Sequence, residues 1–254
     1  MNPRTIAIIA TGALVSLALA QQPPQGGGQQ PPPPGKGKQG GGQGNRQGRG
    51  ARKPPQDGIV KPSMSDTIKG AMYADNWFML YVNGKQVAVD SIDFLPHNVV
   101  AIDLLPEYPM TIAVLAKDNA DPVTGCEYGR QIGDGGFILR FADGTVTDAS
   151  WKAKCFMHGP IDRDTANPKV RSEPLPKDWF AVGFDDASWD QATEYPQDRI
   201  DPKEPFFQHD FSGARWIWTS DLDLDNTVVL RKRVDKPGWS PRWTTKPDLT
   251  PSAE

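Results

Sequence analysis

The sequence WFMLYVNGKQVAV at residues 77–89 decides the fold of this chain. Two apolar runs flank Asn83-Gly84, and Asn-Gly is the strongest short signal for a hairpin because both central residues of a type I′ turn need a positive φ. The run before the turn is aromatic and aliphatic, and Gln86 to Val89 follow it with strand-forming residues. This stretch therefore predicts two antiparallel strands joined by a tight turn.

The pattern of short strands continues toward the C-terminus. Apolar residues alternate along 100–104, 110–114 and 137–141, and further strands are expected at 145–147 (after a second hairpin turn at Asp143-Gly144), 214–218 and 227–234. No window supports a long amphipathic helix, and residues 186–192 are expected to form one short turn. Several short, regularly punctuated strands predict an all-β sandwich or barrel.

Three segments in one order carry a family resemblance: DNWFMLYVNGK at 75–85, FDDASWDQA at 184–192, and ARWIW at 214–218 followed by VLRKRV at 229–234. With the strands at 99–102 and 111–117, this set resembles the galactose-binding-like jelly-roll modules over residues 68–236. The resemblance implies a jelly-roll β-sandwich that commonly binds glycans and in some members carries a structural calcium. Segments 117–136 and 151–177 depart from the compact pattern and are interpreted as insertions.

The N-terminus has the pattern of an export signal. Arg4 precedes the uncharged stretch from Ile6 to Ala18, and small residues at Ala18 and Ala20 stand before Gln21. These features predict a signal peptide at residues 1–20 that is cleaved after Ala20, and an uncleaved membrane anchor is the alternative. We therefore expect a protein exported to the periplasm or the extracellular space, with no membrane span after cleavage.

Composition divides the rest of the chain. Residues 21–57 are rich in Gly, Gln and Pro and are predicted to be a disordered linker. Residues 1–57 carry a net charge of +6, whereas the remaining 197 residues carry −9. An acidic body excludes a basic nucleic-acid-binding domain, although the linker could adhere loosely to polyanions. We expect the sandwich to occupy residues 58–240 and a short tail to occupy 241–254.

The chain has only two cysteines, Cys126 and Cys155, one in each insertion. Export to an oxidising compartment predicts that they form a disulfide, which would pin one insertion to the other. A metal site that uses both cysteines and His158 is the alternative, although no CxxC or His-x-His spacing supports it.

Aromatic residues in the insertions are the candidate sugar-binding residues. An exposed ring stacks on the C–H face of a sugar while polar groups satisfy the hydroxyls. We expect this role for Trp151, Trp179 and Tyr128, with Arg130 beside them, whereas most other tryptophans are expected in the core and Trp239 and Trp243 are expected to hold the tail against the body.

Oxygen-rich residues near strand ends form a candidate calcium site: Asp75, Asn76, Asp118, Asn119 and Asp121. Asp185-Asp186 is expected to cap the turn above a buried Trp189. The run Asp221 to Asn226 lacks the glycine of an EF-hand loop and is expected to be a connector whose leucines turn inward.

No established catalytic motif occurs in the sequence: there is no G-x-S-x-G, no H-E-x-x-H and no phosphate-binding glycine loop. The three histidines, His97, His158 and His209, are interpreted as surface or hydrogen-bonded residues. We expect a secreted, non-catalytic module that binds extracellular carbohydrate. The alternatives are a polysaccharide-active hydrolase and a cell-envelope or matrix scaffold without a small ligand.

Overall fold

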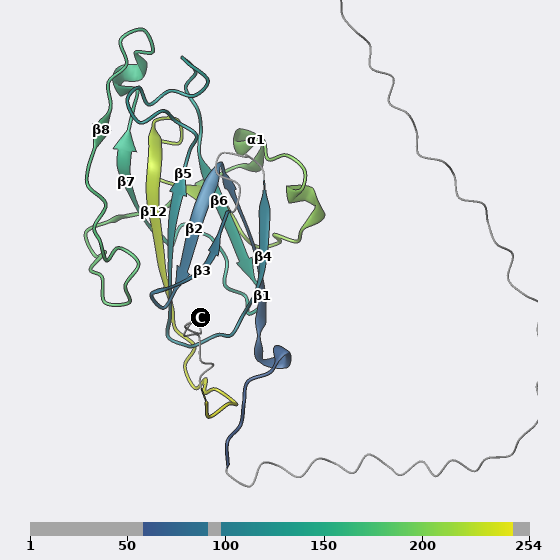
Figure 1. The fold of residues 1–254 in the computed structure, drawn as a ribbon. Helices are drawn as coiled ribbons and strands as arrows, with labels where there is room; N and C mark the ends of the chain where they lie inside the picture. Colours follow the sequence, from purple (N-terminus) through teal and green to yellow (C-terminus); the bar gives the residue numbers. More distant parts are fainter. Residues whose placement is uncertain (1–57, 91–97, 246–254) are drawn as a thin grey trace, which may run out of the picture. The chain divides into compact units, whose positions relative to one another are not determined.

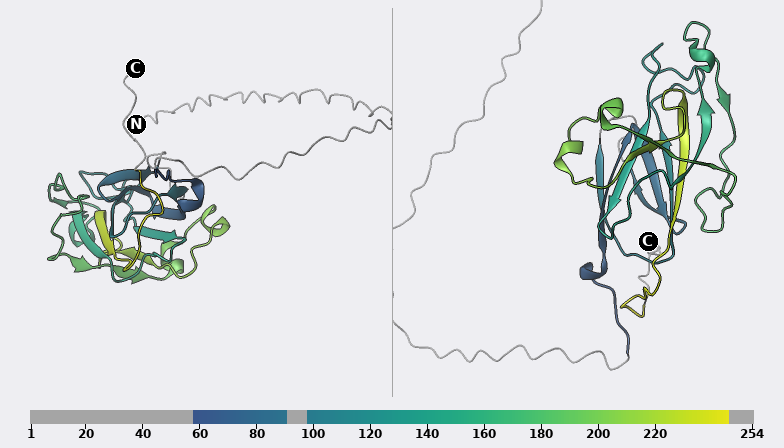
Figure 2. Two further views of the ribbon diagram at one scale, coloured as in Figure 1. Left: turned by 90° about the horizontal axis from the view of Figure 1, so that it is seen from below. Right: turned by 180° about the vertical axis from the view of Figure 1, so that it is seen from behind.

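The computed structural model describes residues 58–90 and 98–245 (Figure 1). The predicted signal peptide, the predicted linker and His97 lie outside these residues. Twelve short strands form two antiparallel sheets, which face each other as the layers of a β-sandwich (Figure 1, Figure 2). The all-β prediction is therefore confirmed. Within the described ranges, no helix has both the length and the apolar character that a membrane span requires.

The first sheet has five strands in the order β10-β11-β6-β1-β4. These are β10 (Thr193–Tyr195), β11 (Trp216–Trp218), β6 (Gly136–Phe141), β1 (Ile68–Asp75) and β4 (Val99–Leu104). The central strand β1 pairs antiparallel with both β6 and β4. Its apolar residues Met72, Tyr73 and Ala74 are wholly buried, because both faces of this strand are covered.

The second sheet follows the order β3-β2-β5-β12-β7-β8, and β9 also pairs with β7. Its strands are β3 (Lys85–Val89), β2 (Trp77–Val82), β5 (Met110–Lys117), β12 (Asp225–Val234), β7 (Lys152–His158), β8 (Arg171–Ser172) and β9 (Asp190–Gln191). The predicted hairpin joins β2 to β3, and Asn83 and Gly84 have φ of 48° and 76°, which confirms the type I′ expectation.

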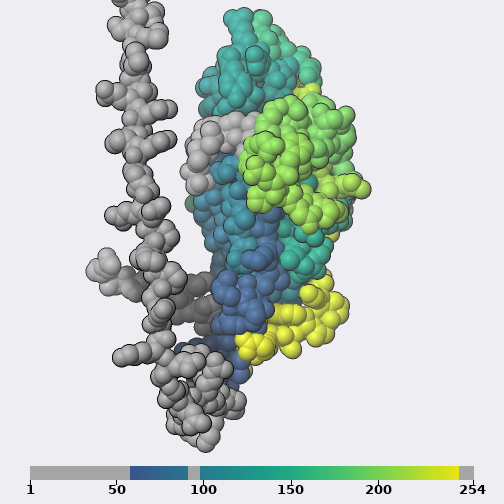
Figure 3. All heavy atoms as spheres, turned by 90° about the vertical axis from the view of Figure 1, so that its right-hand side faces the viewer, coloured from purple at the N-terminus to yellow at the C-terminus, as the bar shows by residue number. Residues whose placement is uncertain are grey.

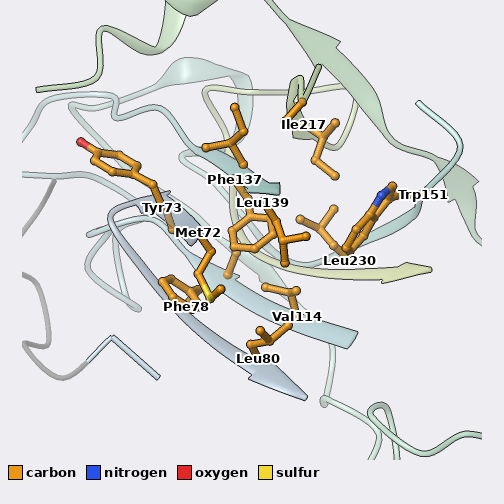
Figure 4. Close-up of a cluster of buried hydrophobic side chains, with 14 of the residues drawn as sticks. Met72, Tyr73, Phe78, Leu80, Val114, Phe137, Leu139, Trp151, Ile217 and Leu230 are labelled. Atoms are coloured by element: carbon orange, nitrogen blue, oxygen red, sulfur yellow. The ribbon is translucent and has the colours of Figure 1, made fainter. Parts of the chain in front are cut away.

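The main core lies between the two sheets (Figure 4). Phe78, Leu80 and Val114 from the seven-stranded sheet meet Phe137 and Leu139 from the five-stranded sheet, and all five are fully buried. They occupy alternate positions on their strands, so each strand directs one face into this layer. Burial of these aromatic and aliphatic side chains is the main stabilising term for the sandwich.

A long connection covers the outer face of the five-stranded sheet. Residues 196–214 include the short helices α1 (Gln197–Ile200) and η3 (Phe206–Gln208) and lie over this face in the side view (green in Figure 3). Phe206 packs against Tyr73 and Trp216 with ring centroids 5.8 and 5.3 Å apart, and Ile200 is 2 % exposed. The segment thus adds a third, partial layer, which the sequence patterns did not predict.

The C-terminal segment packs against the start of the body. The Thr244 backbone N–H donates to the Val60 carbonyl at 2.8 Å, and Arg242 forms an ion pair with Asp66 in η1 (Met64–Asp66). Trp243 is 7 % exposed and packs against Trp239. The expectation that these tryptophans hold the tail is confirmed, so the packed body extends past the predicted boundary at residue 240.

The structure corrects the predicted strand pattern at two places. The segment 151–177 is not wholly an insertion, because β7 is a full strand of the seven-stranded sheet and pairs with β12. Strand β1 was also missed. Both strands lack the clean apolar alternation of a half-buried strand: β1 is covered on both faces, and Lys152 and Lys154 interrupt the apolar residues of β7.

Candidate functional site

Acidic residues gather at the end of the sandwich where β1 and β5 end and β6 and β12 begin (upper part of Figure 1). We call Asp75, Asp118, Glu127 and Asp134 the acidic cluster. Asp75 is the last residue of β1, and Asp118 directly follows β5. Glu127 and Asp134 come from the loop between β5 and β6 and carry charges close enough to disturb the titration of Asp75.

The predicted pairs Asp75-Asn76 and Asp118-Asn119 do lie together. Asn76 Nδ2 donates to Asp75 Oδ1 at 2.7 Å, and Asn76 Oδ1 accepts from the Asn119 backbone N–H at 2.7 Å. The same N–H also donates to Asp118 Oδ1 at 2.6 Å. Asp75, Asn76 and Asp118 are 6 %, 5 % and 2 % exposed, so they form a buried polar bridge between the ends of β1 and β5.

The aspartates of the cluster, Asp75, Asp118 and Asp134, have raised pKa values. Burial, then the charges of Asp134 and Glu127, raise the pKa of Asp75 to about 7. Burial, then the adjacent Glu127 carboxyl, raise the pKa of Asp118 well above its usual range. Gly133 is what allows this approach, because a Cβ there would lie 2.5 Å from Asp118 Oδ2 and 2.8 Å from Glu127 Cδ.

An arginine network bounds the cluster on one side. Arg199 of α1 pairs with Asp134 at 3.2 Å and also with Asp223, which in turn pairs with Arg163 at 2.9 Å. These partners neutralise part of the negative charge, so the unpaired excess remains at Asp75, Asp118 and Glu127.

The five residues predicted to bind calcium do not all lie together. Asp121 is separate from the other four: its Oδ1 accepts from the Val123 and Thr124 backbone N–H groups at 2.9 and 2.8 Å and closes its own turn. Among the described residues, no three Asp, Glu, His or Cys side chains converge as ligands of a metal ion. Asp75 and Asp118 each accept a hydrogen bond that helps to fasten the ends of β1 and β5 together.

A hollow beside the cluster contains the predicted residue Tyr128. This cavity of about 450 Å³ is lined by residues of the β5–β6 loop, among them Asn119, Asp121, Thr124 and Tyr128. The Tyr128 ring is 68 % exposed, and its backbone has a φ of 43°. Arg130 is also exposed. An exposed aromatic ring above carboxylate, amide and hydroxyl groups can stack on a sugar and bind its hydroxyls.

The other two predicted ring platforms are buried, so this part of the prediction was wrong. Trp151 is 0 % exposed in the core, where its indole N–H donates to the Val146 carbonyl at 2.9 Å (Figure 4). Trp179 is 5 % exposed and packs edge-to-face on Tyr81 with centroids 5.1 Å apart. Trp151 directly precedes β7 and Trp179 lies in a turn, yet both rings pack against residues of the body, so proximity to an insertion was a poor guide to exposure.

Cys126 and Cys155 are free thiols in the structure, in contrast to the predicted disulfide. The Cys126 thiol lies 3.7 Å from the Thr124 carbonyl, and the Cys155 thiol donates to the Met157 carbonyl at 3.1 Å. Cys155 lies within β7, a strand of the seven-stranded sheet. The alternative metal site of both cysteines with His158 does not form either.

His158 and Asp225 form a pair that the sequence patterns did not identify. His158 Nδ1 lies 2.6 Å from Asp225 Oδ1, and Thr219 donates to Asp225 Oδ2 at 2.6 Å. Burial, then the Asp225 charge, raise the pKa of the neighbouring Cys155 thiol far above its usual range. A thiol that stays protonated is a poor nucleophile.

Two further motifs have the roles that the sequence predicted. Asp185 Oδ1 accepts from the Ala187 backbone N–H at 3.0 Å, next to the buried Trp189. Leu222 and Leu224 are buried, while Asp221 Oδ1 accepts from the Leu224 backbone N–H at 3.1 Å. Both acidic runs thus close turns of their own segments.

Glu127 and Asp134 are the members of the cluster that sequence reasoning missed. Glu127 stands among loop residues with no periodic pattern, and Asp134 lies in a run of glycines. The glycines themselves were the available signal, because a glycine between two acidic groups allows close approach of carboxyl groups to the backbone.

Comparison of the chain with protein-family models, with curated proteins and with solved structures gave no match. The fold and the sites therefore rest on the residues described above.

Proposed function

We propose that this chain is an exported, non-catalytic carbohydrate-binding module with a galactose-binding-like jelly-roll fold. All strand pairs are antiparallel, and the chain passes repeatedly from one sheet to the other, with β1, β4 and β6 in the five-stranded sheet and β2, β5 and β12 in the other. Such crossing between layers is the arrangement of a double-sheet jelly roll and supports the assignment. The predicted signal peptide supports export.

The single observation that carries the binding proposal is the Tyr128 hollow. Tyr128 is far more exposed than the buried tryptophans of the core, and ordered loop residues surround it. Buried hydrogen bonds from Asp75, Asn76 and Asp118 fix the start of this loop, so the ring is presented on a firm base. Holding a binding surface in its bound shape reduces the entropy lost on binding.

The test is a glycan array probed with the mature chain, followed by titration calorimetry on each glycan that binds. We expect Tyr128→Ala to weaken binding at least about tenfold, because stacking on one aromatic ring contributes roughly 1–3 kcal/mol to association in comparable ring-stacking sites. The matched control is Val182→Ala, which truncates another exposed apolar side chain, 51 % exposed, that lines neither this hollow nor any other cavity described in the body.

Binding of a neutral glycan that survives Tyr128→Ala would contradict this site, and an array without any bound glycan would contradict the proposed function. Thermal unfolding of both variants shows whether a loss of binding reflects a loss of folding. Tyr128 is exposed, so we expect both midpoints to stay within about 2 °C of the wild-type value.

A further inference from the structure

A second cavity lies on the outer face of the five-stranded sheet, between strands β10 and β11 and the covering segment 196–214. Its volume is about 430 Å³, which is in the range of small-molecule sites. It is separate from the Tyr128 hollow, and the two share no lining residue. Nothing in the packing of the sandwich requires an opening at this place.

Aromatic rings form one wall of this cavity. Phe206 stacks on Phe211 with centroids 4.9 Å apart and lies 5.3 Å from Trp216. Phe207, which also lines the cavity, stays 56 % exposed, and its ring lies 5.2 Å from that of Phe206. An exposed ring at the edge of an apolar wall offers a flat ligand a surface that water wets poorly.

The polar lining consists of hydrogen-bond donors with unused capacity. Arg215 and His209 line the cavity, and the lining contains no Asp or Glu. The Arg215 guanidinium pairs with no carboxylate of the described residues. The indole N–H of Trp216, whose side chain is 3 % exposed, is buried and finds no acceptor among the residues that the structure describes.

A cavity lined by an arginine and by no acidic residue is unusual in this acidic body. The body is acidic, with a net charge of −9 over residues 58–254, yet this cavity presents a guanidinium and has no carboxylate in its lining. A carboxylate is the acceptor that an arginine binds best, with two parallel hydrogen bonds.

We propose that this cavity binds a sugar ring that carries a carboxylate, that is, a uronic acid residue of an acidic polysaccharide. The ring lies against Phe207 and the aromatic wall that includes Trp216, and the carboxylate pairs with Arg215. The neutral hydroxyls of a uronic acid satisfy the Gln197 amide, which also lines the cavity. The site is independent of Tyr128 and adds a preference for acidic glycans to the proposed module.

The experiment is an NMR titration of the mature, isotope-labelled chain with methyl β-glucuronide and, as the matched neutral ligand, methyl β-glucoside. The Trp216 indole signal is assigned by its loss in Trp216→Phe. We expect the glucuronide to shift this signal and to bind at least about tenfold more tightly than the glucoside, since hydrogen bonds to a charged group are stronger than neutral ones. Raising the salt concentration should weaken the binding of the glucuronide and leave the binding of the glucoside unchanged.

Arg215→Gln tests the role of the guanidinium, and Arg171→Gln is the matched control, because Arg171 is an exposed arginine that lines neither cavity. We expect Arg215→Gln to abolish the preference for the glucuronide and Arg171→Gln to leave it unchanged. Equal binding of the two glycosides, a preference that survives Arg215→Gln, or equally tight binding of benzoate would each overturn the proposal. Tyr128→Ala should not alter the titration, so failure of the Tyr128 site and failure of this site are distinguishable.

Discussion

Arg231 reaches out of the central strand β12 and places its Nε 2.7 Å from Asp186 Oδ2, with only 3 % of the arginine side chain exposed. The same guanidinium donates to the Trp179 carbonyl and, at 3.1 Å, to the Ala181 carbonyl. One buried cation thus organises the whole segment from 179 to 186 over the outer face of the seven-stranded sheet. Phe184 adds its ring 5.1 Å from the guanidinium carbon.

Removal of Asp186 should therefore be costly. In Asp186→Ala the buried guanidinium keeps its two carbonyl acceptors but loses its counter-charge, and we expect unfolding free energy to fall by roughly 3 kcal/mol. Urea denaturation followed by tryptophan fluorescence measures this loss. The matched control is Asp103→Ala, which breaks the exposed pair with Lys69 and should cost less than about 1 kcal/mol. Equal effects of the two variants would contradict the central role of Arg231.

The acidic cluster should make stability depend on pH in an unusual direction. The folded-state pKa of Asp75 is raised from 3.8 to about 7, so the folded protein binds more protons than the unfolded chain between these values. The contribution of this group is fully present below about pH 4 and is lost as the pH rises through 7. We expect stability to decline over this range by up to about 1.4 kcal/mol per pH unit.

Asp75→Asn isolates this contribution. Asparagine keeps an oxygen that can accept from Asn76 but cannot ionise, so the decline between pH 5 and pH 8 should become shallower and the variant should be more stable than wild type at pH 8. Urea titrations at pH 5, 6, 7 and 8 supply the comparison. A profile of the variant parallel to that of the wild type would show that Asp75 does not titrate in this range.

The C-terminal segment should protect the start of the body from opening. The Val60 backbone N–H donates to Thr244 Oγ1 at 2.8 Å, and Trp243 is buried next to Trp239. In Trp243→Ala we expect the Val60 amide to exchange with deuterium at least about tenfold faster, because local opening becomes easier by more than 1.4 kcal/mol. Amides of β5 and β12 serve as the internal reference and should exchange at unchanged rates.

The free cysteines predict a definite chemical behaviour. Cys126 is 2 % exposed and the pKa of the Cys155 thiol is strongly raised by burial, so both should react slowly with Ellman's reagent in the native protein. In 6 M guanidinium chloride two thiols per chain should react at once. Protein purified from the periplasm under non-reducing conditions is the appropriate sample, and fewer than two titratable thiols in it would show that the cysteines pair.

Local chemistry was enough to predict the elements that depend on neighbours in the sequence. Asn83-Gly84 specified its turn because few dipeptides tolerate two positive φ values, and Phe137, Leu139 and Phe141 revealed their strand by alternation. Strand β1 was not predicted from the sequence because its burial on both faces depends on the segment 196–214, which lies more than a hundred residues away. The burial of Trp151 and Trp179 also depends on packing against residues that are distant in the sequence.

The candidate sites likewise fall into one that could be predicted from the sequence and one that could not. Asp75, Asn76, Asp118 and Asn119 were predictable because they lie next to the ends of the predicted strands that became β2 and β5, and strand ends meet at the edge of a sandwich. The cavity that contains Arg215 and Trp216 was not predictable, since its walls come from one edge of a sheet and from an irregular segment with no periodic pattern. An unpaired buried donor is visible only when every possible partner has been placed.

Strand β12 is the last strand of the described chain and also the one that joins β5 to β7 inside the seven-stranded sheet. Until residues 225–234 have left the ribosome, β3-β2-β5 and β7-β8 are two separate half-sheets, each with an open edge. Folding must therefore wait for nearly the whole body to be synthesised, and open edges invite pairing with other chains in the meantime. For the exported chain that we propose, such a delay would be an advantage, because it would keep the chain unfolded until it has crossed the membrane.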